Sequence, residues 1–293
     1  MTQDPSDRST SSTTYQTSAV NGYPAKVEPA SPSSRSLCDV CLEIREKVDS
    51  FLAEEPSTAL LRNVQTRVRE AMGVVDEAFQ RYQPREISIS YNGGKDCLVL
   101  LIIILACLAH RSPKPNKNES SRSPTESSSS LRFPEKFQAI YIVSPHPFSE
   151  IDDFVVSSST EYQLDVTRYE LGMKRGLEVY LQDHPDIKAI FVGTRRTDPH
   201  GEKLTHFDPT DGGWPAFMRV HPVIDWHYAE IWAFIRHLEI PYCPLYDQGY
   251  TSLGGTEDTQ PNPNLKKEAT DGGGFLPAYK LVGDDEERLG RDK

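Results

Sequence analysis

The sequence has few features of membrane or nucleic-acid-binding proteins. None of its 293 residues belong to an uninterrupted apolar run of about 18, so no membrane span is expected. The 32 Lys and Arg residues are outnumbered by 43 Asp and Glu, giving a net charge of −11. A nucleic-acid binder needs a basic face, so this charge argues against one. Five cysteines in a chain of this length are typical of a reduced, intracellular protein. We therefore expect a cytoplasmic protein without membrane or nucleic-acid partners.

The N-terminal stretch lacks the apolar core of a signal peptide and the arginines of a transit peptide. It is rich in Ser, Thr and Pro, and such a composition buries too little apolar surface to offset the entropy of ordering. We predict a disordered tail over residues 1–35 and a single α/β domain over residues 36–293. A second Ser-rich stretch, residues 111–132, is predicted to be a flexible surface insertion in that domain.

Residues 87–101 combine a buried strand, a glycine turn and the start of an apolar helix. Gly93 and Gly94 permit positive φ and close approach of the backbone to a ligand. A strand, a glycine turn and a helix N-terminus together favour a bound phosphate. A plain Asn-Gly-Gly turn is the alternative. Lys95 and Asp96 in the first helical turn favour the phosphate site. The spacing matches neither Gly-x-x-x-x-Gly-Lys-Ser/Thr nor Gly-x-Gly-x-x-Gly.

Apolar residues recur with helical spacing over residues 37–53 and 58–82, and Ser57 or Thr58 is expected to cap the second helix. The elements predicted after the glycine turn are strands 137–143, 164–169, 189–192 and 277–281, and helices 150–162, 173–182 and 227–238. Strands alternating with helices indicate a parallel sheet with right-handed crossovers. The expected fold is α/β: an open, mostly parallel twisted sheet with helices on both faces, plus N-terminal helices and a C-terminal extension.

Cys38 and Cys41 form a Cys-x-x-Cys pair, which is found in metal and redox sites. No second Cys or His pair follows at a zinc spacing, and the two cysteines fall within a predicted amphipathic helix. We interpret them as residues of a helix face.

The loop at residues 193–202 follows a predicted strand, at the sheet edge where open α/β proteins bind ligands. Its arginines suit phosphate, and Asp198 suits magnesium or ribose. A solvated polar loop is the alternative. Trp214 lies on a turn-rich stretch and suits stacking on a ring system, the alternative being a place in the core. Asp225 is expected to cap the helix at 227–238, with ligand binding as its alternative role.

Residues 90–97 (SYNGGKDC) resemble the pyrophosphate loop, Ser-x-Gly-Gly-x-Asp-Ser, of the ATP pyrophosphatase and phosphoadenylyl-sulfate reductase superfamily. Asn92 stands where Gly or Ser is common, and Cys97 where Ser is common. The version Tyr-Asn-Gly-Gly-Lys-Asp-Cys is similar to that of the FAD synthetases (FMN adenylyltransferases) of fungi and animals. Three further segments resemble that family in the same order, so that the resemblance covers about residues 85–291: 193–201, 244–254 and 287–291.

The resemblance implies an adenine nucleotide alpha hydrolase-like, reductase-like fold and the reaction FMN + ATP → FAD + pyrophosphate, the final step of FAD biosynthesis. It implies Mg²⁺ as cofactor and a C-terminal extension, residues 256–293, over the active site. We expect a monomer whose partners are the small molecules ATP and FMN.

The resemblance also assigns roles to residues. The implied catalytic residues are Asn92, Asp96, Asp198, Arg288 and Arg291, with Asp96 and Asp198 also implied as Mg²⁺ ligands. The implied ATP and pyrophosphate contacts are Ile89, Ser90, Tyr91, Gly93, Gly94, Lys95, Cys97 and Ile142. The implied flavin contacts are Gly193, Thr194, Arg195, Asp211, Trp214, Asp225 and Trp226. The two arginines, three residues apart, are expected to share one helical face, and a frayed tail is the alternative.

Two other classes of function stay open. A sulfonucleotide reductase needs a nucleophilic cysteine in a C-terminal tail, whereas the last cysteine here, Cys243, lies in a Pro-rich turn. Another ATP pyrophosphatase, such as a tRNA-thiolating enzyme, would need cysteine pairs and a basic surface. A non-catalytic protein of the same fold would bind FMN or ATP without turnover.

Overall fold

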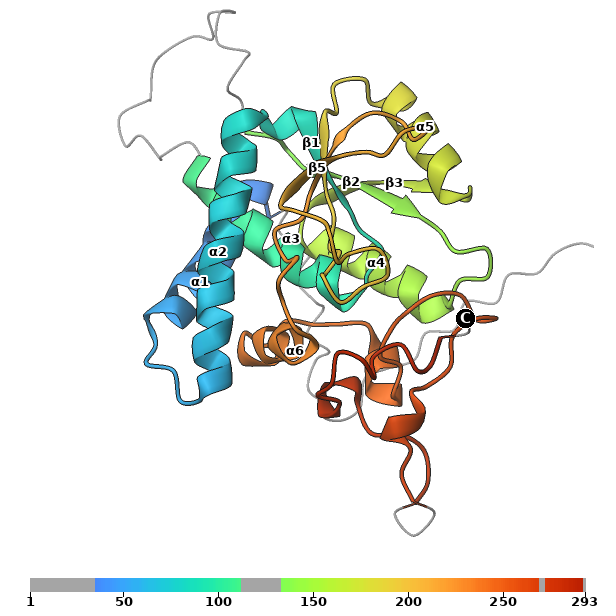
Figure 1. The fold of residues 1–293 in the computed structure, drawn as a ribbon. Helices are drawn as coiled ribbons and strands as arrows, with labels where there is room; N and C mark the ends of the chain where they lie inside the picture. The colour runs from blue at the N-terminus through green and yellow to red at the C-terminus, as the bar shows by residue number, and fades with distance from the viewer. Residues whose placement is uncertain (1–34, 112–132, 269–271, 292–293) are drawn as a thin grey trace, which may run out of the picture. The chain divides into compact units, whose positions relative to one another are not determined.

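The computed structural model describes residues 35–111, 133–268 and 272–291, which are built around a six-stranded sheet (Figure 1). The predicted tail and Ser-rich insertion lie almost wholly outside the described residues. The helices are α1 (Leu37–Ala53), α2 (Ala59–Arg81), α3 (Lys95–Leu108), α4 (Ser149–Glu161), α5 (Met173–Asp183) and α6 (Tyr228–His237). The strands are β1 (Ile87–Ser90), β2 (Phe137–Ile142), β3 (Leu164–Tyr169), β4 (Ala189–Phe191), β5 (Phe207–Pro209) and β6 (Met218–Val220).

The strand order is β3-β2-β1-β4-β6-β5, and β5 is antiparallel to β6 while the other neighbours run parallel. The chain proceeds outward from β1 through β2 to β3 and then returns to the other side of β1 as β4. The strand order thus reverses between β1 and β4, which is where open α/β sheets bind ligands beyond the carboxyl ends of their strands. The prediction of an α/β fold with an open, mostly parallel sheet is confirmed.

Successive residues of the central strands face opposite sides of the sheet, as the period of two requires. In β2, Ala139 and Tyr141 pack into the larger core with α3, while Ile140 packs with Leu177 and Tyr180 of α5. The predicted helices on both faces are present, and Figure 1 shows α5 across the sheet from α3 and α4.

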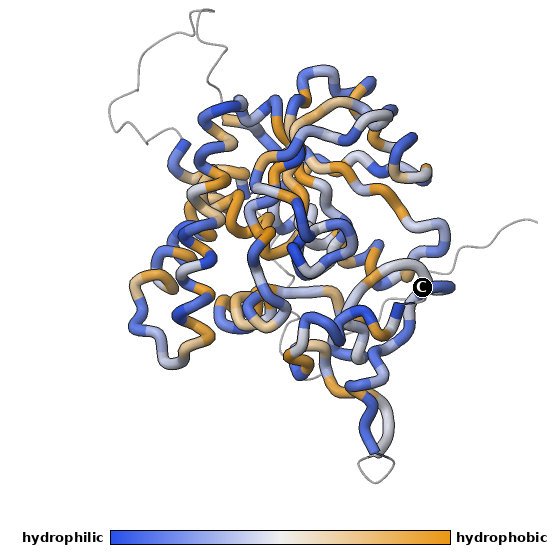
Figure 2. The backbone as a smooth tube through the Cα atoms, viewed as in Figure 1, coloured by the Kyte–Doolittle hydropathy of each residue, from blue (hydrophilic) through white to orange (hydrophobic). Residues whose placement is uncertain are grey.

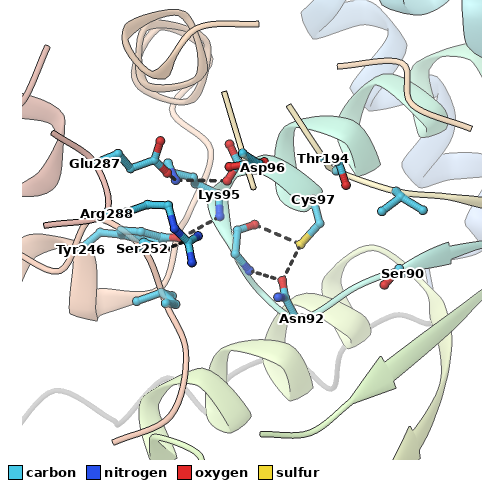
Figure 3. A pocket seen from close by; sticks show the side chains of 15 residues that line it. Ser90, Asn92, Lys95, Asp96, Cys97, Thr194, Tyr246, Ser252, Glu287 and Arg288 are labelled. Atoms are coloured by element: carbon cyan, nitrogen blue, oxygen red, sulfur yellow. Dashed lines mark hydrogen bonds and ion pairs between the residues drawn. The ribbon is translucent and has the colours of Figure 1, made fainter. Parts of the chain in front are cut away.

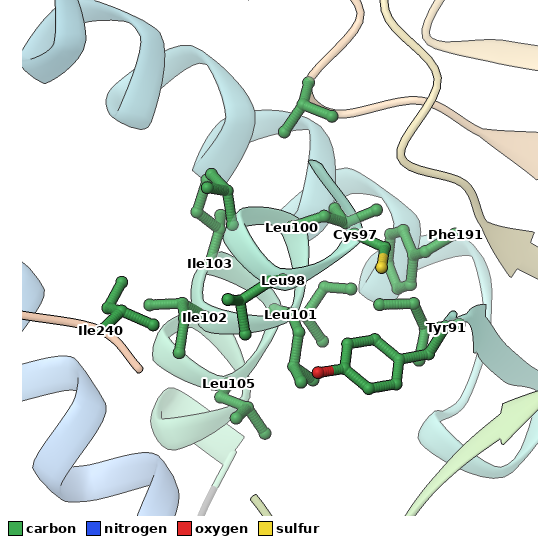
Figure 4. Close-up of a cluster of buried hydrophobic side chains, with 14 of the residues drawn as sticks. Tyr91, Cys97, Leu98, Leu100, Leu101, Ile102, Ile103, Leu105, Phe191 and Ile240 are labelled. Atoms are coloured by element: carbon green, nitrogen blue, oxygen red, sulfur yellow. The ribbon is translucent and has the colours of Figure 1, made fainter. Parts of the chain in front are cut away.

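Helix α3 is the centre of the larger core. All of its residues except Asp96 are buried, and Figure 2 shows hydrophobic residues concentrated along it. Leu98, Leu101 and Leu105 pack among side chains that include Phe191 of β4 (Figure 4). Burial of each such side chain stabilises the fold by roughly 1.5–3 kcal/mol. No helix in the described ranges is long and apolar enough to cross a membrane.

The N-terminal helices cover this core. Thr58 caps α2 by accepting a hydrogen bond from the backbone N–H of Leu61, as expected. Cys41 is buried on the inner face of α1, and burial raises the pKa of its thiol to about 12. No cluster of three or more metal-binding side chains was found in the described part of the chain. The position of Cys41 is that of a core residue.

Three local predictions are wrong. Strands β5 and β6 were missed, because each has three residues and turn residues separate them. The strand predicted at 277–281 is a 3-10 turn, Ala278–Lys280. Helix α6 is capped by His227 and not by Asp225. In addition, Asp284 accepts a hydrogen bond from the backbone N–H of Tyr228 at 2.6 Å. A cap supplied from 56 residues away leaves no local signal in the sequence.

Candidate active site

A cavity of about 240 Å³ lies beyond the ends of β1 and β4, where the strand order reverses (Figure 3). Of the residues predicted to form the site, those that line this cavity are Ser90, Asn92, Gly94, Lys95, Asp96, Cys97, Gly193, Thr194, Asp198 and Arg288. Segments far apart in the chain thus meet at one place. The fold brings half of the predicted site residues together around this cavity.

The glycine turn directs the start of α3 toward the cavity. Gly93 has a φ of +73°, a conformation that other residues adopt at a cost. Gly94 is the N-cap of α3 and has no side chain to cap it. Its own N–H donates to Asn92 Oδ1 at 3.0 Å, and the N–H of Lys95 donates to the Tyr246 hydroxyl at 2.8 Å. The positive end of the helix dipole therefore borders the cavity and favours an anion there.

Gly193 allows the loop after β4 to touch the start of α3. A Cβ atom at this position would lie 2.8 Å from the backbone nitrogen of Cys97 and 3.1 Å from the carbonyl carbon of Asp96. Both neighbours are backbone atoms of a buried helix, which cannot move aside alone. Only glycine fits this contact between the two halves of the site.

The ammonium group of Lys95 is held by the protein itself. The residue is 1% exposed, and its Nζ lies 3.1 Å from Asp96 Oδ2, 2.5 Å from Glu287 Oε1 and 3.2 Å from the carbonyl oxygen of Thr251. Since an ammonium group has three N–H donors, all are used. Burial alone would lower the pKa of Lys95, but the two carboxylates raise it above its usual value. Lys95 borders the cavity without presenting its charge to a ligand there.

Arg195 is also buried, contrary to the prediction that it contacts flavin. Its Nε lies 2.9 Å from Asp96 Oδ1, and it forms ion pairs with Asp198, Asp284 and Glu287. Burial opposes the charge, but the carboxylates raise the pKa of Arg195 further above its usual value. Four carboxylates enclose the guanidinium group of Arg195. It supports the residues that line the cavity and is not accessible to a flavin ring.

The carboxylates outnumber the cations in this cluster. Burial alone would raise the pKa of Asp96, but Arg195 and Lys95 hold it below its usual value. Burial and the nearby Asp96 raise the pKa of Asp198 above its usual value. With all groups ionised, two cations face four carboxylates, so the cluster has two excess negative charges. A cation bound in the cavity beside Asp96 and Asp198, which both line it, would balance this excess negative charge.

The two C-terminal arginines have different surroundings. Arg288 is exposed and lines the cavity, with Nη1 3.5 Å from Ser252 Oγ (Figure 3). Arg291 is not among the lining residues. Its Nη1 donates to the carbonyl oxygen of Leu253 at 2.9 Å, and its Nη2 lies 3.0 Å from Asp258 Oδ2. The segment forms turns and no regular helix, so the predicted shared helical face is wrong.

Several other predicted contacts belong to the core. Ile89 and Tyr91 are fully buried, and the Tyr91 hydroxyl donates to Ser158 Oγ at 2.9 Å. Trp226 is 2% exposed and packs edge-on against Phe234. Their side chains support the glycine turn and α6 but do not reach the cavity.

The remaining predicted residues do not line this cavity. Ile142 lines a separate hollow of about 640 Å³ at the ends of β2 and β3, together with Leu171 and Met173. Asp211 and Trp214 are exposed on the loop between β5 and β6. Trp214 is therefore on the surface, which removes the core alternative. Asp225 forms an ion pair of 2.6 Å with Arg196.

Glu287, Tyr246 and Ser252 also line the cavity and were not predicted as site residues. Each lies in a segment that resembles the FAD synthetase family, at 244–254 or 287–291. Those motifs were the available signal. That Glu287 is buried against two cations follows only from the packing.

The open parallel sheet and the glycine turn after β1 are shared with a known protein family. A family model described as the phosphoadenosine phosphosulfate reductase domain matches residues 86–261, and the chain belongs to this family. A probable FAD synthase of Schizosaccharomyces pombe is 38% identical over 242 residues, covering 83% of this chain and 84% of that protein. A probable FAD synthase of Caenorhabditis elegans is 34% identical over 258 residues, covering 85% of this chain and 45% of that longer protein.

Among solved structures, the FMN adenylyltransferase of Candida glabrata in complex with FAD and inorganic pyrophosphate is similar, with a TM-score of 0.77. It is 29% identical to this chain, and the match covers 90% of this chain and 99% of that one. Within the reductase-like family, the chain belongs to the FAD synthases.

Proposed function

We propose that this protein transfers the adenylyl group of ATP to FMN, giving FAD and pyrophosphate, the final step of FAD biosynthesis. The observation that carries the proposal is the N-terminus of α3, whose N-cap Gly94 has no side chain, beside a polar cavity where the strand order reverses. The products bound to the similar C. glabrata enzyme support the same reaction.

The FMN phosphate is ionised and serves as the nucleophile, so the reaction needs no strong general base. One of its oxygens forms a bond to the α-phosphorus of ATP, while the bond between that phosphorus and the bridging oxygen breaks and pyrophosphate leaves with the electron pair. Catalysis then consists mostly of positioning and charge stabilisation. We place the leaving β- and γ-phosphates at the glycine turn, beside the positive end of the α3 dipole. Asn92, Ser90 and Cys97 border that position.

We further propose that Asp96 and Asp198 hold Mg²⁺. The two cavity-lining carboxylates fit this ion, because Mg²⁺ is commonly bound by one or two carboxylates together with substrate phosphates. The excess negative charge of the cluster would otherwise repel ATP. When bound, the ion would neutralise charge on the phosphates. Asp96 meanwhile holds Lys95 and Arg195 in place.

Arg288 is the cation best placed to meet the reacting phosphates, because it is exposed and lines the cavity. Gly193 and Thr194 border the same space. We assign adenine to the hollow lined by Ile142, and the flavin ring to the side of Trp214 and Asp211. Both of these side chains are exposed on one loop.

The assignment is tested by incubating the purified protein with FMN, ATP and Mg²⁺ and separating flavins and pyrophosphate by chromatography. We expect equal amounts of FAD and pyrophosphate. FMN or ATP binding without any FAD above background would instead identify a non-catalytic protein. A reductase is disfavoured because Cys243 is buried, which raises the pKa of its thiol to about 11.

We propose in addition that the enzyme acts as a cytoplasmic monomer with ATP and FMN as its partners. The net charge of −11 supports the absence of a nucleic-acid partner. Sedimentation of the purified protein at micromolar concentration tests the monomer: a species of twice the 33.0 kDa chain mass would contradict it.

A further inference from the structure

We propose that Glu287 is a positioning residue for adenylyl transfer: by joining Lys95 to Arg195 it holds Arg288 in the cavity. This inference rests on the proposed function.

The carboxylate of Glu287 joins the two halves of the site. The residue is 5% exposed, and its two oxygens contact different cations. Oε1 lies 2.5 Å from Lys95 Nζ, in the first turn of α3, and Oε2 accepts from Arg195 Nη2, in the loop after β4. The Glu287 side chain thus links the start of α3, which follows β1, to the loop after β4. These are the two segments that flank the reversal of the strand order.

The backbone beside Glu287 is anchored as well. The Thr251 hydroxyl donates to the carbonyl oxygen of Glu287 at 2.6 Å. The side-chain amide of Asn262 donates to Thr251 Oγ1 at 2.9 Å and to the carbonyl oxygen of Glu286 at 2.8 Å. These are buried or half-buried contacts, so the segment is fixed by side chain and backbone together.

Arg288 follows Glu287 directly and projects into the cavity (Figure 3). The buried carboxylate and the exposed guanidinium therefore leave the same turn in different directions. If the carboxylate lost its charge, Lys95 and Arg195 would be left with less compensation, and buried charges tolerate that poorly. The turn would shift, and the guanidinium group of Arg288 would shift with it.

The central test is a double-mutant cycle with Glu287→Gln and Arg288→Lys, following FAD formation. We expect Glu287→Gln to lower kcat at least tenfold in the natural sequence but less than threefold beside Arg288→Lys, because the effect passes through Arg288. The KM for ATP should change less than threefold in both. Fully additive losses in kcat, or a loss confined to KM, would overturn the proposal.

Two variants separate charge from shape. Glu287→Asp keeps the carboxylate and should recover at least part of the lost kcat. Glu286→Gln is the matched control. In the described residues, the only hydrogen bond of the Glu286 carboxylate is to the Asn264 side chain, so kcat should stay within twofold. Equal losses for Glu286→Gln and Glu287→Gln would overturn the proposal.

Should Glu287→Gln fail to fold, Thr251→Val replaces it in the cycle, because it removes the hydroxyl that anchors the carbonyl oxygen of Glu287 without touching a charge. We expect the same non-additivity with Arg288→Lys, and additivity would again overturn the proposal. The unmutated protein distinguishes the two levels: if it makes no FAD, the proposed function fails, whereas FAD formation with additive losses removes this inference alone.

Discussion

The two sides of the cavity are built in different ways. One side consists of β1, the glycine turn and α3, which is regular structure held by apolar burial. The other side comes from residues 244–291, where the described segments are 3-10 turns and loops. This second side packs Leu245, Leu265 and Leu281 into the core and is joined to the first by the buried ion pairs and hydrogen bonds of Glu287 and Thr251. Apolar burial is non-directional, whereas the ion pairs fix direction, and direction is what a phosphate-binding arginine requires.

The largest expected effect is on the ion pairs that join the two sides. Lys95→Met keeps most of the length of the side chain but removes one of the two cations, Lys95 and Arg195, that pair with both Glu287 and Asp96. We expect the free energy of unfolding to fall by about 3–5 kcal/mol, the usual cost of breaking a buried pair. Urea unfolding measures this change.

Arg45→Ala is the control for Lys95→Met, because it removes an exposed pair with Asp49 on α1. It should cost less than about 1 kcal/mol. If both variants lost the same small amount of unfolding free energy, the buried ion pairs of Lys95 would contribute no more to stability than the exposed pair, contrary to this prediction.

The next effect concerns the contact between the loop after β4 and the start of α3. Gly193→Ala places a methyl group 2.8 Å from a backbone nitrogen of that helix. We expect kcat/KM for FAD synthesis to fall about 100-fold, near 3 kcal/mol, because the two halves of the site are pushed apart. Gly73→Ala in α2, where no atom lies within 4 Å of the added carbon, should leave kcat/KM unchanged. An active Gly193→Ala enzyme would show that the contact is dispensable.

Acid should lower the free energy of unfolding through a buried histidine at the end of a strand. His221, directly after β6, is buried, and this burial lowers its pKa to about 4. Between pH 6.5 and 4 the unfolded state therefore binds a proton that the folded state does not, so stability falls as the pH falls. We expect a loss of about 2 kcal/mol between pH 7 and pH 5 from this group.

Urea unfolding of the unmutated protein and of His221→Asn at both pH values measures that loss. The asparagine variant should lose about 2 kcal/mol less than the natural protein over this interval. An equal pH dependence in both proteins would assign the effect to other groups.

The smallest expected effect separates activity from stability. Arg288 is exposed, so Arg288→Ala should leave the thermal midpoint unchanged. It should nevertheless lower the turnover of FMN at least tenfold, about 1.4 kcal/mol of transition-state stabilisation. A drop in the midpoint without a drop in turnover would make Arg288 a structural residue, like Lys95.

Much of the fold and part of the site follow from local patterns. The strand, glycine turn and helix at residues 87–101 were predicted with their phosphate-binding character, since each depends on near neighbours in the chain. The alternation of strands and helices from β2 to β4 was predicted for the same reason. Strands β5 and β6 were not, because three-residue strands are specified by the neighbours they pair with.

The roles of the charged residues depended on packing. The sequence alone determined the glycine turn at Gly93 and Gly94 and the helix α3 after it, and from these it predicted an anion site, because torsion angles, helix polarity and apolar periodicity are local properties. Only the tertiary structure decided that Lys95 and Arg195 are enclosed by carboxylates while Arg288 faces the cavity. Whether a cation meets a substrate or a neighbouring carboxylate is a matter of burial and direction. Residues as distant as Lys95 and Glu287 come together only when the chain folds.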